Sequence, residues 1–204
     1  YPIADNDSPQ LSADRLEYTL GDLRCYGFAG ADAIRAFYED LTVWQDEAGR
    51  PELAFCTLET ACAFTEAALS VSRVYVADED RFAMQALADL LRDAVGREVL
   101  TEDDLYQEEP FVIQRLEADP VSAAWWRRFR RFCRVERRAE RPEGGIWYRI
   151  PAKLRYIDPL VAGRGRVSRL DGGVRQAQEA FLATDFTCWI GVPEGAGKEN
   201  DGKS

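Results

Sequence analysis

The chain has 204 residues, of which 46% are hydrophobic and 30% charged, and its formal net charge at pH 7 is -10. This apolar content is too high for a disordered chain, and it fits one compact domain or one domain with a small appendage. The negative charge argues against a protein whose main role is to coat nucleic acid or an anionic membrane, because overall repulsion would oppose binding.

The first predicted helix runs from Ser12 to about Cys25. Ser12 is a good N-cap, and leucines recur after it at helical spacing. A second, shorter helix is expected at residues 31–41. Two short β-prone runs then flank a turn, which predicts a β-hairpin over residues 42–55.

Two long helices follow, and both carry apolar residues at helical spacing. The first is capped by Thr57 and reaches about Ala77, and the second covers about residues 80–95. We expect them to form the core of the domain. Thr101 and Asp104 then form a capping box ahead of a short helix that ends before Pro120.

Residues 120–141 continue a helical pattern in which arginines alternate with tryptophan and phenylalanine. After this run, β-prone segments, among them RVSRL, alternate with one helix at about residues 174–183. This alternation predicts a small α+β subdomain over residues 142–193. The Gly-, Lys- and acid-rich tail at 194–204 is expected to be disordered.

Several classes of site and location are excluded by what the chain lacks. It has no run of about 20 apolar residues that could span a membrane and no signal peptide, so we expect no membrane partner and a cytoplasmic location. The five cysteines lack CxxC spacing, so neither a disulfide framework nor a zinc knuckle is expected. There is no histidine, which excludes a histidine-containing catalytic triad or a histidine-ligated metal from this chain alone.

The segment SADRLEYTLGD, residues 12–22, carries the most chemical information. On a helix, Asp14, Tyr18 and Asp22 lie four residues apart and share one face, with Arg15 beside them. Such a row suits a site for a metal ion and a phosphate group. From spacing alone, a solvated polar face on which Arg15 makes an intrahelical contact is favoured over such a site, because charge on a helix face is ordinary.

This segment resembles the last metal-ligand helix of the HD-domain phosphohydrolases, in which a His and a His-Asp pair precede a distant Asp. The similarity continues through ALSVSRVYVADEDRFAMQALADLLRDAV and LTEDDLYQEEPFVIQRL, so it covers about residues 12–116. It implies a mainly α fold in which residues 1–141 are the C-terminal part of a helical HD-like domain. The β-hairpin and the small α+β C-terminal subdomain complete that expected fold.

The resemblance also implies roles for individual residues. Asp14 would be a metal ligand, and Arg15, Tyr18 and Asp22 would contact the phosphate and sugar of the substrate. Tyr75 would face the same pocket. The implied reaction is hydrolysis of a phosphate ester, such as a nucleotide or another phosphorylated small molecule, with a divalent metal ion whose identity (Mn, Mg, Fe or Zn) the sequence leaves open.

The family's His and His-Asp ligands do not occur in this chain. We expect them upstream of Tyr1, so the chain alone should be an inactive fragment that binds metal only when those ligands are present. A homo-oligomer is compatible with the sequence, and a nucleic-acid partner is not expected.

A rival hypothesis is a catalytically inactive helical module that binds a protein partner or a polyanion through the run from Arg127 to Arg141. The arginines of that run would pair instead with carboxylates of this acidic chain if the run only supports the fold. The segment with Lys153 and Arg155 also has two interpretations: it is either a second anion contact that reaches the pocket or an ordinary exposed strand.

Overall fold

The computed structural model describes residues 3–132 and 134–194, and the chain divides into two compact units. Unit 1 combines Tyr1–Val76 with Lys153–Thr184, and unit 2 combines Ala77–Ala152 with Asp185–Ser204. About half of the described chain is helical and two small sheets are present, so the fold is mixed α+β. The residues of the expected C-terminal subdomain, 142–193, contribute to both units.

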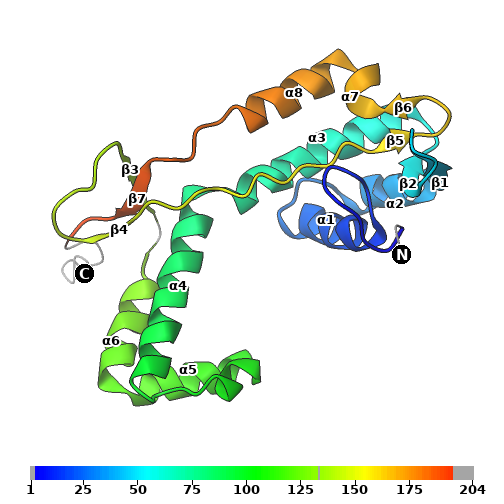
Figure 1. The fold of residues 1–204 in the computed structure, drawn as a ribbon. Helices are drawn as coiled ribbons and strands as arrows, with labels where there is room; N and C mark the ends of the chain where they lie inside the picture. Colours follow the sequence, from blue (N-terminus) through cyan, green and yellow to red (C-terminus); the bar gives the residue numbers. More distant parts are fainter. Residues whose placement is uncertain (1–2, 133, 195–204) are drawn as a thin grey trace, which may run out of the picture. The chain divides into compact units, whose positions relative to one another are not determined.

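Helix α3 (Leu58–Tyr75) runs through the middle of unit 1, and the side chain of Thr57 caps it as predicted. Helices α1 and α2 pack on one side of α3 and helices α7 and α8 on the other (Figure 1). Buried phenylalanines at the centre contact one another, with the rings of Phe37 and Phe64 5.6 Å apart. The surrounding helices are α1 (Ala13–Cys25), α2 (Ala31–Glu39), α7 (Val167–Leu170) and α8 (Gly172–Leu182).

The sheet of unit 1 has the strand order β1-β2-β5-β6. Strands β1 (Leu41–Gln45) and β2 (Pro51–Phe55) form the predicted hairpin. In its turn, the Asp46 carboxylate accepts hydrogen bonds from the backbone of Ala48 and Arg50. Strand β5 (Leu160–Val161) pairs in parallel with β2, and β6 (Gly165–Arg166) pairs antiparallel with β5.

One β-prone prediction in this region is wrong, because RVSRL forms helix α7 over most of its length. The buried carboxylate of Asp158 explains the outcome. It accepts hydrogen bonds from the backbone N–H of Ser168 at 2.9 Å and from its hydroxyl at 2.6 Å, which stabilises the first turn of the helix.

Glu52 is the central polar residue of unit 1. Its side chain on β2 is only 2% exposed, and its carboxylate accepts two hydrogen bonds from Arg166 on β6, at 2.6 and 2.7 Å. The same carboxylate accepts the backbone N–H of Leu11 at 2.9 Å, just before α1 begins. One buried charge pair therefore fixes the start of α1 against two strands of the sheet.

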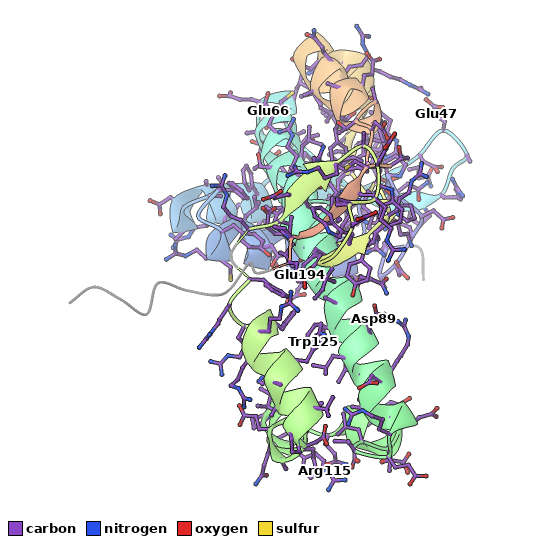
Figure 2. All side chains as sticks on the ribbon, turned by 90° about the vertical axis from the view of Figure 1, so that its left-hand side faces the viewer. Glu47, Glu66, Asp89, Arg115, Trp125 and Glu194 are labelled. Atoms are coloured by element: carbon purple, nitrogen blue, oxygen red, sulfur yellow. The ribbon has the colours of Figure 1, made fainter. Side chains whose placement is uncertain are left out.

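In unit 2, helices α4 (Asp78–Gly96) and α6 (Pro120–Phe129) pack side by side, and Trp125 lies between them (Figure 2). Helix α5 (Glu109–Ala118) packs against α6. The predicted capping box is present: Thr101 and Asp104 exchange backbone and side-chain hydrogen bonds at 2.9 and 3.2 Å. It opens a single 3-10 turn, η1 (Asp103–Tyr106).

The second sheet belongs to unit 2 and has the order β3-β7-β4. Its strands are β3 (Glu136–Arg138), β4 (Ile146–Tyr148) and β7 (Trp189–Val192). The expected helical pattern over residues 120–141 is therefore wrong beyond Phe129. Pairing with β7 draws Glu136–Arg138 into an extended strand, and tertiary pairing of this kind overrides local helix preference.

The sequence also led to expectations about membrane-spanning helices, the cysteines and the C-terminal tail. Among residues 3–132 and 134–194, no helix is both long and apolar enough to cross a membrane. Cys25, Cys56, Cys62 and Cys188 carry free thiols, and Cys133 lies outside the described residues. Apart from Glu194, the expected disordered tail also lies outside them.

The Glu52–Arg166 pair leads to a stability prediction. Glu52→Gln keeps the shape of the side chain but leaves a largely buried guanidinium without its counter-charge, so unit 1 should lose about 3 kcal/mol of unfolding free energy. Urea titration followed by circular dichroism measures this loss.

The matched control is Glu47→Gln. Glu47 projects from the β1–β2 turn (Figure 2), and its ion pair with Arg169 is exposed on both sides, so this change should barely move the midpoint. Equal midpoints for the two variants would show that the buried pair does not hold unit 1 together.

Candidate functional site

Helices α1 and α3 bring Asp22 and Tyr75 together. The side chain of Ser12 accepts the backbone N–H of Arg15, which fixes the first turn of α1, and Leu16 and Leu23 are buried toward the core. On the other face of α1, the Asp22 carboxylate accepts a hydrogen bond from the Tyr75 hydroxyl at the end of α3. Two of the sequence-predicted site residues therefore meet across a helix pair.

A small hollow lies beside this contact. About 10 Å³ of it is open to water, which is room for about one water molecule. Arg15 and Tyr18 from α1 and Tyr75 from α3 line it, together with the extended segment at 155–157. The other lining residues are mostly apolar or carry hydroxyl groups: Thr19, Ala68, Val71, Ser72, Tyr156 and Ile157.

The guanidinium of Arg15 is engaged by the residues that precede α1. It donates to the side-chain oxygen of Asn6 at 2.8 Å, to the backbone carbonyl of Asn6 at 2.9 Å, and to the carbonyl of Gln10. These contacts hold the N-terminal segment on α1. Arg15 thus lines the hollow, while its guanidinium anchors Asn6 and Gln10 to α1.

Asp14 is exposed and does not line the hollow. In the part of the chain that the structure describes, no group of three His, Cys, Asp or Glu residues is placed to hold a metal ion. A single exposed carboxylate binds a divalent cation weakly, because such ions need several oxygen or nitrogen ligands. The residues present therefore do not form a metal site by themselves.

Burial raises the pKa of the Tyr75 phenol, and the hydrogen bond to the Asp22 carboxylate raises it further. Both effects disfavour a phenolate, since burial penalises its charge and Asp22 would repel it. Tyr75 therefore stays protonated at neutral pH, as a hydrogen-bond donor.

Sequence reasoning missed three hydroxyl residues of the hollow, Thr19, Ser72 and Tyr156. Ser72 lies three residues before Tyr75, so helical spacing could have placed it on the same face of α3. Tyr156 gave no local signal, because long-range hydrogen bonds position its segment. One of these joins the hydroxyl of Ser8 to the carbonyl of Tyr156 at 3.0 Å.

Several arginines of the run from Arg127 to Arg141 have partners within unit 2. Arg137 forms an ion pair with Asp78, and Arg138 with Glu136. Arg128 and Arg141 lie over aromatic rings, 5.7 Å from the centre of Phe132 and 5.5 Å from that of Trp189. These contacts favour a supporting role for the run.

The partners of Asp78 show how the run is tied to α4. Burial by itself would raise the pKa of this carboxyl, but hydrogen bonds from Arg137 and Arg81 lower it below its ordinary value. Asp78 is therefore charged at neutral pH and joins the start of α4 to β3.

Comparison with known protein families, with curated proteins and with solved structures finds no match to this chain.

The Tyr75–Asp22 contact predicts a pH effect. The unfolded phenol ionises near pH 10, whereas the folded one holds its proton to higher pH, so stability should fall as pH rises above about 10. Tyr75→Phe should cost about 1 kcal/mol at neutral pH and make this alkaline loss shallower. Urea titrations at several pH values measure both effects, and Tyr38→Phe, at a 66% exposed phenol, should keep the wild-type slope.

The arginine partners predict weak polyanion binding. The unmodified chain should show negligible affinity for heparin at low salt, and the double variant Arg127→Ala/Arg130→Ala should behave like it. A steep loss of heparin binding with added salt in the unmodified chain would instead support the rival binding module, because counterion release produces that slope.

Proposed function

We propose that this chain is the C-terminal portion of an HD-type metal-dependent phosphohydrolase that acts on a phosphate ester such as a nucleotide. The observation that carries the proposal is the hydrogen bond between Tyr75 and Asp22. It joins the SADRLEYTLGD helix to the later long helix at a hollow, which is where the resemblance expects substrate contacts. Two observations therefore support the proposal: the SADRLEYTLGD motif and the contact of its Asp22 with Tyr75.

Within this proposal the chain's residues have distinct tasks. Tyr18 offers its hydroxyl group to the substrate, while the protonated Tyr75 donates its hydrogen bond to Asp22 and holds that carboxylate in place. Asp14 would supply one carboxylate to a metal ion. Because the chain contains no histidine, the imidazole ligands of such a site must come from residues outside these 204.

The rival remains a catalytically inactive module that binds a partner through Arg127 to Arg141. The paired and ring-stacked arginines of that run do not favour it. The gene upstream of residue 1 separates the two hypotheses. If it encodes no His and no His-Asp pair, the phosphohydrolase proposal fails.

The decisive experiment uses a longer protein that carries this upstream segment. It should hydrolyse at least one member of a panel of nucleotides and phosphomonoesters when supplied with Mn²⁺ or Mg²⁺. Asp14→Ala should lower kcat/KM by at least about 100-fold, because a missing metal ligand removes transition-state stabilisation. Folding should be little affected, since Asp14 is exposed.

Glu17→Ala is the matched control, since Glu17 is an exposed carboxylate on the same helix that does not line the hollow. It should retain wild-type activity. Equal activity of the Asp14→Ala protein and the wild type would show that Asp14 is not a metal ligand.

A further inference from the structure

The hollow between α1 and α3 has an unusual charge for this acidic chain. Among the residues that the structure describes, the charged ones that line it are Arg15 and Arg155, although the chain carries a net charge of -10. The Asp22 carboxylate lies beside the hollow, bonded to Tyr75, and is not part of its lining. A second hollow in unit 1 contrasts with it, because Arg50 and Arg169 there pair with the lining carboxylates Asp46 and Glu47. The first hollow is therefore the better place for an anion.

The two arginines differ in what holds their side chains. The guanidinium of Arg15 is bound to Asn6 and Gln10. Arg155 is exposed, and within the described ranges its guanidinium has neither an ion pair nor a hydrogen bond. Of the two, Arg155 is ready to receive a ligand without first breaking a contact.

The backbone around Arg155 is nevertheless firmly placed. The N–H of Asp158 donates to the carbonyl of Pro9 at 2.8 Å, and the buried amide of Gln178 donates to the carbonyl of Ile157 at 3.1 Å. Arg166 adds a bond to the carbonyl of Asp158 at 2.9 Å. The fixed backbone keeps Arg155 beside the hollow, so only its exposed side chain has to be ordered when a ligand binds.

We propose that Arg155 binds a phosphate group at the mouth of this hollow, and that this anion site works without a metal ion. The planar guanidinium matches two phosphate oxygens at once. Because the hollow has room for about one water molecule, the phosphate sits at its mouth and directs at most one oxygen inward, into the space that Tyr18 and Tyr156 help to line. The inference rests on the proposed function for the identity of the ligand as a phosphate ester.

The test uses the 204-residue chain with inorganic pyrophosphate as the probe, at low salt and with a metal chelator present, by titration calorimetry. The unmodified chain should bind the probe. Arg155→Ala should weaken binding by at least about tenfold, which is the effect of losing one charge-assisted contact of about 1.4 kcal/mol. Arg155→Lys, which keeps the charge but not the two-pronged geometry, should fall between them.

The matched control is Arg35→Ala, which removes the same charge from an exposed position of α2 outside the hollow. Its affinity should stay within about twofold of the wild type, since loss of one distant charge is largely screened. Equal weakening by Arg155→Ala and Arg35→Ala, or no binding by the unmodified chain, would overturn the proposal.

The outcomes also separate this inference from the proposed function. Pyrophosphate binding that depends on Arg155, together with a longer protein that hydrolyses no phosphate ester, would keep the anion site and reject the enzyme. Hydrolysis by the longer protein with an unchanged KM in its Arg155→Ala variant would keep the enzyme and reject the anion site.

Discussion

The buried carboxylate of Glu52 is the contact on which the arrangement of unit 1 depends. It binds Arg166 from β6 and the backbone of Leu11, so segments far apart in the sequence converge on one charge. Arg166 in turn binds the carbonyl of Asp158, next to the segment that lines the hollow. The hydrogen bonds of Glu52 and Arg166 therefore position both the start of α1 and the segment at 155–157. The site residues themselves make none of these hydrogen bonds. Such a network is costly to disturb, because removing one member leaves another buried charge unpaired.

Elements defined by local signals were predicted well. A serine or threonine cap with apolar residues at helical spacing located α1 and α3 within a few residues, and turn chemistry located the β1–β2 hairpin. Elements defined by distant partners were not. Strand β3 becomes a strand by pairing with β7, which lies more than 40 residues further along the chain. No glycine or proline marks the end of α6 at Phe129, so the sequence pattern predicts a helix that continues through the following arginines.

The candidate site shows the same division. Helical spacing placed Tyr18 and Asp22 on one face of α1, and the structure adds Tyr75 from α3 as the partner of Asp22. Spacing could not show that Asp14, one turn earlier, stays at the surface, or that the guanidinium of Arg15 binds Asn6. The position of the Arg15 guanidinium depends on where residues 6–10 fold back on the helix, and long-range contacts such as that between Pro9 and Asp158 set this position.

The division of each unit between separate stretches of chain has a consequence for synthesis. Glu52 and Arg166 are 114 residues apart, so a ribosome that adds about 5–20 residues per second delivers the arginine on the order of ten seconds after the glutamate. During that interval all of Ala77–Ala152, a part of unit 2, is translated. Unit 1 therefore cannot form its buried Glu52–Arg166 pair until Arg166 has been synthesised, so its assembly is completed late rather than from the N-terminus onward.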